Sequence, residues 1–320
     1  MARERTAADL LGAVPPSALV LTGIVSVQIG AGLAGRMFGQ VAVAAVTGLR
    51  LWSAAILLAA LAGRGLSRVV RAMVTDRAWR DGAVVVAFGV TLGVMNFAFY
   101  QALARIPLGI AVTIEFLGPL TVAVASSRRL VDVLWVGLAA AGVLLLARGG
   151  TQRAPLAAAG QRAGPGTVTV GVICALIAAA SWAAYILLSR STGRRFSGSS
   201  GLVIAMAVAA LIVTPPAVAA GGRALTRPGV LGTGIAIGLL SSVIPYRLEL
   251  ETLRRIPARV FGIWMSLEPA VAALVGLFLL GEALAVSQWA AIGCVIIASA
   301  GAARDGPAAA GPGQVPPPAS

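Results

Sequence analysis

Long apolar runs dominate the chain, and short segments that hold most of the charged residues separate them. Each run is close to the about 20 residues that a helix needs to cross the hydrocarbon layer of a membrane. The pattern therefore predicts an all-α integral membrane protein with ten transmembrane helices. The ten runs cover residues 18–35, 41–63, 82–104, 106–127, 130–147, 167–189, 200–220, 229–246, 256–280 and 283–303.

The arginines between these runs predict how the helices are oriented. All 25 basic residues are Arg, and the absence of Lys is typical of GC-rich bacterial coding. If the N-terminus is cytoplasmic, 16 arginines fall in segments that face the cytoplasm and 7 in segments that face outward. Because positively charged loops remain inside, we expect a multi-pass protein of the bacterial cytoplasmic (inner) membrane with both termini in the cytoplasm.

Composition agrees with a membrane protein and argues against a soluble one. The chain is 58% hydrophobic and 11% charged, whereas soluble domains carry about 25% charged residues. A net charge of +14 would suggest nucleic acid as the partner of a soluble protein. Here topology explains the arginines, so we expect a lipid bilayer as the partner and no nucleic acid.

The chain contains an internal repeat. Residues 102–120, ALARIPLGIAVTIEFLGPL, align with residues 252–270, TLRRIPARVFGIWMSLEPA, at an offset of 150 positions, and both segments share R-I-P and a second Pro. Each repeat then holds five helices, and an odd number places the second repeat upside down in the membrane. Inverted repeats are typical of secondary transporters with a midplane substrate site, although a duplicated scaffold that transports nothing remains an alternative.

This repeat sets the expected domain boundaries. The Gly- and Pro-rich connection reads as a linker, and the last residues read as disordered. The segments are a cytoplasmic N-terminal segment (1–17), a first five-helix repeat (18–148), a linker (149–166), a second five-helix repeat (167–303) and a disordered cytoplasmic tail (304–320).

Two acidic residues lie beside expected helix breaks. A carboxylate at the centre of a bilayer costs roughly 2.5–3.5 kcal/mol on insertion scales, yet Glu115 lies within the fourth run. Pro119 cannot donate to the carbonyl of Glu115, and Pro269 directly follows Glu268. Because broken backbone is tolerated where it lines a cavity, we predict that both acids line one. The alternative is structural, a buried acid held by an arginine such as Arg50.

Other polar and aromatic residues within the runs are candidates for the same cavity. Asn96 and Tyr100 share one helical face, and the repeat offset relates Tyr246 to Asn96. For the mid-span aromatics, ordinary packing is an equally good explanation. The full set of substrate-binding candidates is Gln28, Asn96, Tyr100, Glu115, Trp182, Tyr185, Tyr246, Glu249, Trp264 and Glu268, with Glu115 and Glu268 also the candidates for proton coupling.

The sequence disfavours an enzyme, a metal site or a cofactor. It contains no His, no Gly-rich phosphate loop and only two Cys, Cys174 and Cys294, each inside an apolar run. We also expect Glu251 to pair with Arg247 and Arg255, and Glu282 to lie at the membrane interface.

Nearly the whole chain resembles the EamA family of the drug/metabolite transporter superfamily, and within it the bacterial inner-membrane exporters of threonine and homoserine. The stretches that carry this likeness are SVQIGAGLA (26–34), VTGLRL (46–51), SWAAYIL (181–187) and the longer segments 93–136 and 244–270.

The resemblance implies a ten-helix fold with two EamA repeats and export of small neutral amino acids by proton antiport with alternating access. It carries onto Asn96, Tyr100, Glu115, Tyr246, Glu249 and Glu268. One departure is Arg247 in PYRLE, where these exporters usually have a small polar residue. A multidrug or other metabolite exporter, a passive channel and a non-transporting scaffold are the alternatives. On the amino-acid reading, Glu115 binds the substrate ammonium group or carries the exchanged proton.

Overall fold

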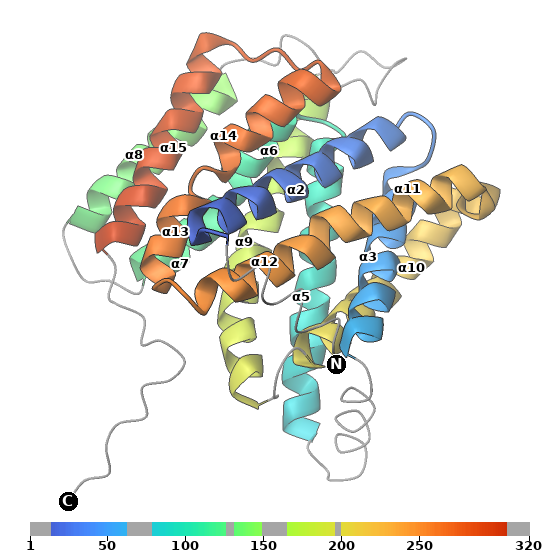
Figure 1. Cartoon of the computed structure of the whole chain (residues 1–320). Helices are drawn as coiled ribbons and strands as arrows, with labels where there is room; N and C mark the ends of the chain where they lie inside the picture. The colour runs from blue at the N-terminus through green and yellow to red at the C-terminus, as the bar shows by residue number, and fades with distance from the viewer. Residues whose placement is uncertain (1–13, 63–78, 126–130, 149–164, 196–199, 306–320) are drawn as a thin grey trace, which may run out of the picture.

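The computed structural model describes residues 14–62, 79–125, 131–148, 165–195 and 200–305, and this part of the chain is helical throughout, without a strand (Figure 1). The first half contains α2 (Pro16–Met37), α3 (Val43–Ala62), α5 (Trp79–Leu103), α6 (Leu108–Glu115), α7 (Leu117–Ala125) and α8 (Val131–Arg148). The second half contains α9 (Pro165–Arg195), α10 (Ser200–Gly221), η2 (Gly222–Thr226), α11 (Pro228–Gly238), η3 (Leu239–Val243), α12 (Ile244–Leu253), α13 (Ala258–Met265), α14 (Glu268–Val275), η4 (Gly276–Leu280) and α15 (Val286–Asp305).

The predicted membrane architecture is confirmed at the level of a multi-pass helical protein. Within the described residues, nine helical segments are long and apolar enough to cross a membrane. α8 coincides with the fifth apolar run of the sequence but is not among these nine. Three of the nine are interrupted rather than straight: α6 with α7, α11 with α12, and α13 with α14.

Two of these interruptions lie where the prolines predict them. α6 ends at Glu115 and α7 begins at Leu117, so the break falls just before Pro119, which has no N–H for the Glu115 carbonyl. α13 ends at Met265 and α14 begins at Glu268, again directly before a proline. Both expected helix breaks are therefore confirmed, and each places a carboxylate at a helix end.

A third interruption was not predicted. The backbone between α11 and α12 widens into the π-helical turn η3, and Pro245 follows it. Because Pro245 lacks an N–H, the carbonyl of Ser241 is open to other donors, and Nη2 of Arg50 donates to it over 3.4 Å. Oγ of Ser26 donates to the neighbouring carbonyl of Leu240 over 2.8 Å.

The first helix of each half packs into the other half. α2 packs against α11, α12, α13 and α14, which all belong to the second half. α9, the first helix of the second half, packs mainly against α5, α6 and α7 of the first half. Figure 1 shows α2 alongside α12 and, at one edge of the molecule, α8 beside α15. The two halves are thus interlocked rather than merely adjacent.

Small residues permit the close approach of these helices. A Cβ atom at Gly89 of α5 would lie 2.7 Å from the backbone oxygen of Ala205 in α10. A Cβ atom at Gly238 of α11 would lie 3.1 Å from the backbone oxygen of Arg50 in α3. These glycines bring neighbouring backbones together within the chain, and α3 is thereby held against the π-helical turn.

Candidate functional site

A cavity of about 530 Å³ lies between the two halves of the chain. Its walls come from α2, α3, α5, α6 and α7 of the first half, and from α9, η3, α12, α13, α14 and α15 of the second. Its volume falls within the about 300–1,000 Å³ of small-molecule sites in proteins. The helix breaks at Glu115 and Glu268 both border this cavity.

Eight of the ten candidate residues line this cavity, and two do not. Tyr100 is fully buried behind Arg50, and Trp264 is half-buried on α13 without reaching the lining. The eight lining residues are Gln28, Asn96, Glu115, Trp182, Tyr185, Tyr246, Glu249 and Glu268.

Three carboxylates face the cavity. Glu268, 7% exposed, accepts a hydrogen bond at Oε1 from Nε2 of Gln28 over 2.9 Å, and its Oε2 is buried without a partner in the described residues. Glu115 is 8% exposed and lies close enough to Glu268 for their charges to interact. Glu249 also lies close enough to Glu268 for a charge–charge interaction. The cavity therefore concentrates negative charge beside two helix breaks.

Arg50 is the cation in the cavity wall. Its Cζ atom lies 5.2 Å from the centroid of the Tyr100 ring, a cation–π contact. Its Nε is buried without a hydrogen-bond partner, and no carboxylate of the described chain lies within ion-pair distance of it. Its charge acts on Glu115 through space. The sequence predicts Arg50 only as a possible structural partner of a buried acid, and no acid in the described residues forms an ion pair with it.

Aromatic side chains form an apolar wall next to Glu115. The rings of Phe116 and Trp182 meet edge to face with centroids 5.5 Å apart. A Cβ atom at Gly118 would lie 2.3 Å from the backbone oxygen of Ala179, so this glycine lets α7 approach α9 closely enough for that ring contact. A substrate at Glu115 would thus contact both charge and an aromatic surface.

The cavity is closed at one end, and at the other, open end it extends towards the protein surface. It reaches Leu253, Phe261 and Ala303, near the junction of α12 with α13 and the end of α15. At the opposite end, where α5 meets α6, the chain is tightly packed. The packed residues there are at most 1% exposed: Tyr100, Leu103, Ile106 and Leu108.

Glu282 helps to hold the closed end together. It is 6% exposed, and its Oε2 accepts a hydrogen bond from the backbone N–H of Leu108, the first residue of α6, over 2.8 Å. Burial raises the pKa of this carboxyl from its ordinary 4.5 to about 7, although the bond from Leu108 lowers it. Glu282 therefore caps α6 as a buried side chain of the segment between η4 and α15, which lies outside the candidate membrane spans.

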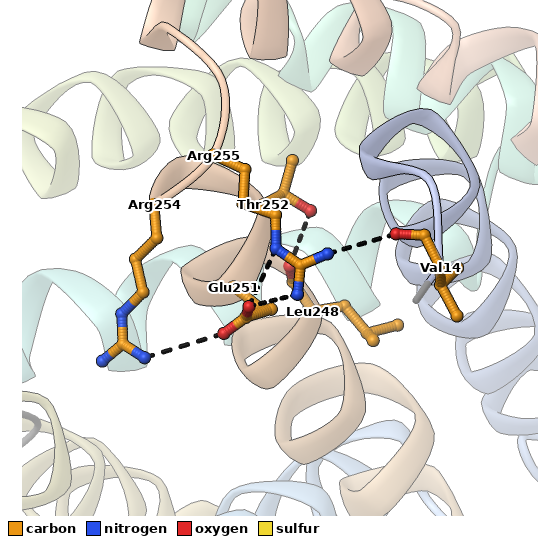
Figure 2. A network of polar contacts seen from close by, with 6 residues as sticks. All are labelled: Val14, Leu248, Glu251, Thr252, Arg254 and Arg255. Carbon is orange, nitrogen blue, oxygen red and sulfur yellow. Dashed lines mark hydrogen bonds and ion pairs between the residues drawn. The ribbon is translucent and has the colours of Figure 1, made fainter. Parts of the chain in front are cut away.

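A second polar network lies near the open end (Figure 2). Glu251 of α12 pairs with Arg255, as the spacing predicts, and also with Arg254 at 3.6 Å. Arg254 takes the place that the sequence assigned to Arg247. Nη1 of Arg255 donates to the backbone oxygen of Val14 over 3.2 Å, and this contact ties the end of α12 to the start of α2.

The described residues contain no group of three or more His, Cys, Asp or Glu side chains that could hold a metal ion. Cys174 and Cys294 are free thiols. The cavity residues offer hydrogen-bond donors, hydrogen-bond acceptors and charged groups of both signs.

Comparisons with known proteins find relatives that are all transporters. The model of the EamA-like transporter family matches residues 169–304. The chain is 39% identical to the threonine/homoserine exporter RhtA of Escherichia coli (strain K12) over 286 residues, which cover 89% of this chain and 90% of that protein. The protein of the same name from Salmonella typhimurium (strain LT2) is 37% identical over the same coverage. These relatives are transporters rather than enzymes, as the sequence predicts.

Two further comparisons are more distant: one is a sequence match to a transporter, and the other is a solved structure of similar fold. The uncharacterized transporter YwfM of Bacillus subtilis (strain 168) is 30% identical over 127 residues, which cover 40% of this chain and 43% of that protein. A solved structure named "Crystal structure of protein" superposes with a TM-score of 0.56 at 18% identity and covers 90% of this chain and 96% of that one.

Proposed function

Because the chain belongs to the EamA-like transporter family, we propose that it exports small neutral amino acids of the threonine and homoserine kind across the bacterial cytoplasmic membrane. The observation that carries this proposal is the cavity between the two halves. It contains three carboxylates, one arginine and an aromatic wall. Both signs of charge in one small site suit a zwitterionic solute.

The proposed architecture is ten transmembrane helices in two inverted repeats of five, with α8 as the fifth crossing. α6 and α13 begin and end at positions related by the same offset of 150 that aligns the two sequence repeats. The packing of α5 on α9 has its counterpart in α12 on α2, and that of α10 on α5 in α11 on α3. These pairs support repeats 18–148 and 167–303; the linker 149–166 and the tail 304–320 lie almost wholly outside the described residues.

The proposed cycle is alternating access. The arginine distribution favours cytoplasmic termini, which would put the junction of α12 with α13 on the cytoplasmic side. The cavity extends towards that junction, so this conformation would be the one that an exporter loads from the cytoplasm. The packed end beside Leu108 would then be the closed outer gate.

The proposed coupling is proton antiport through Glu115 and Glu268. Both carboxylates are buried at helix breaks and face one cavity with largely apolar walls. Carboxylates that share such a site bind a proton or a substrate ammonium group more tightly than an isolated, hydrated carboxylate does. Loading of a proton from outside and of an amino acid from inside would thus compete for the same acids.

A first test of this function is the efflux of labelled threonine and homoserine from cells that express the chain, with and without a protonophore. We expect export that collapses with the proton gradient, and a Glu115→Gln variant that reaches the membrane but loses at least about tenfold in rate, because it can neither release a proton nor bind an ammonium ion by charge. Glu251→Gln is the matched control, since Glu251 lies outside the cavity lining. A fully active Glu115→Gln variant with unchanged pH dependence would exclude Glu115 from coupling.

An exporter of apolar metabolites or drugs is the second candidate, because the Phe116–Trp182 wall offers an aromatic surface. Expressing cells that show resistance to hydrophobic compounds, with no export of any amino acid, would favour that candidate.

A further inference from the structure

Arg50 carries a positive charge within a candidate membrane-spanning helix and lacks a counter-ion in the described chain. An arginine in that position is costly and is almost always paired or functional. Its contacts in the described chain are a 3.4 Å hydrogen bond to the carbonyl of Ser241 and the side chain of Tyr100, whose ring face and hydroxyl both interact with the guanidinium. A guanidinium has five N–H donors, so these contacts leave donors, Nε among them, for a ligand in the cavity that Arg50 lines.

Two contacts fix the orientation of the guanidinium. The Tyr100 ring, fully buried, supports it from one side, and the carbonyl that Pro245 frees in the π-helical turn holds one end. Gly238 brings the backbone of α3 against that same segment. A planar, pre-oriented guanidinium matches the two oxygens of a carboxylate, which a flexible ammonium group does not.

The unpartnered polar atoms around the cavity separate into donors and acceptors. Nε of Arg50 and the neighbouring hydroxyls of Ser241 and Tyr100 are buried without a partner of acceptable geometry in the described residues, and all three can donate. Oε2 of Glu268 and Oε1 of Gln28 are likewise buried without a partner, and both accept. Buried polar groups are normally hydrogen-bonded, so these two sets point to a ligand with an anionic end and a cationic end.

We propose that Arg50 binds the α-carboxylate of the substrate while the carboxylates of Glu268 and Glu115 bind its α-ammonium group, so that the cavity selects zwitterionic α-amino acids. This assignment rests on the proposed function and specifies how its site tells an amino acid from a cationic or neutral solute. A cationic drug would meet the same acids but would leave the guanidinium of Arg50 without a carboxylate to bind.

The test compares binding of L-threonine with binding of L-threoninol, in which a hydroxymethyl group replaces the carboxylate, by calorimetry on the purified full chain. We expect the wild-type protein to bind threonine at least about tenfold more tightly than threoninol, since a charge-assisted bidentate contact is lost in the latter. In Arg50→Gln, threonine affinity should fall to the threoninol level while threoninol affinity changes less than about threefold. Arg223→Gln, at an exposed position in η2, is the matched control and should alter neither affinity.

Arg50→Lys is the second variant, for the case that Arg50→Gln does not fold. It keeps the charge but not the two-pronged geometry, so its preference for threonine should be intermediate. If either variant loses affinity for both ligands equally, Arg50 has a structural role and this assignment is overturned while amino-acid export stands. If the wild-type protein binds no α-amino acid at all, the proposed function itself is overturned, and this assignment with it.

Discussion

At the scale of single residues, the cavity depends on a few buried polar contacts that join distant parts of the chain. Gln28 and Glu268 are 240 positions apart and make a 2.9 Å hydrogen bond with both side chains buried. Such a bond satisfies one oxygen of a buried carboxylate, which would otherwise lack a donor. Gln28 is accordingly a positioning residue for Glu268 as well as a lining residue.

Replacement of Gln28 by Leu should destabilise the protein by about 1–3 kcal/mol, because it leaves a buried carboxylate oxygen without its donor. Thermal unfolding of the purified protein checks this loss. Glu268→Gln combined with Gln28→Leu should recover part of it, since the remaining buried group is then uncharged. A double variant as unstable as the sum of both single variants would contradict the contact.

Glu282 gives a prediction about pH. Its pKa is about 7 in the folded protein and its ordinary value is 4.5, so the folded state holds this proton more tightly than the unfolded chain. Its contribution to stability is therefore greatest below pH 4.5 and is lost as the pH rises through about 7.

Glu282→Gln keeps an acceptor for the N–H of Leu108 but cannot ionise. Relative to the wild-type protein, the variant should gain stability progressively between about pH 4.5 and 7, as shown by the difference between their unfolding temperatures across that range. A difference that does not change with pH would mean that Glu282 is not buried as described.

At the scale of helical elements, prolines decide where the cavity walls break. The local chemistry of Pro119 and of Pro269 is visible in the sequence, so the ends of α6 and α13 could be predicted. The π-helical turn before Pro245, the exposure of Arg50 to the cavity and the capping of α6 by Glu282 could not. The last two depend on contacts between residues 191 and 174 positions apart, which no local pattern encodes.

Pro119→Ala restores a donor for the carbonyl of Glu115 and should let α6 continue into α7. We expect unchanged or higher thermal stability together with a loss of export of at least about tenfold, because Glu115 would turn with the repaired helix. Pro215→Ala is the control: Pro215 also lies inside a helix, α10, but away from the cavity, and transport should persist there. If Pro119→Ala exports as fast as Pro215→Ala, the helix break at Glu115 is not required for transport.

At the scale of the whole molecule, one end of the cavity is packed and the other extends towards the surface. In a chain without its native Cys174 and Cys294, Ala303→Cys should react with a thiol reagent applied from the cytoplasmic side, and threonine should slow the reaction. Ala34→Cys, at a position with 0% exposure in α2, should stay unreactive. Labelling of Ala303→Cys only from outside the cell would reverse the proposed orientation.

The interlocked packing of α2 and α9 also has a consequence for biosynthesis. α2 is the first of the described helices to leave the ribosome, yet the helices it packs against, α11 to α14, are synthesised late, with only η4 and α15 after them. The first membrane segment must therefore wait in the lipid, without its partners, until most of the chain has been inserted. Folding of this protein is then completed late in translation, when α2 packs against helices that are distant from it in the sequence. Truncated products that lack those helices would leave the glycine-rich face of α2 exposed to lipid.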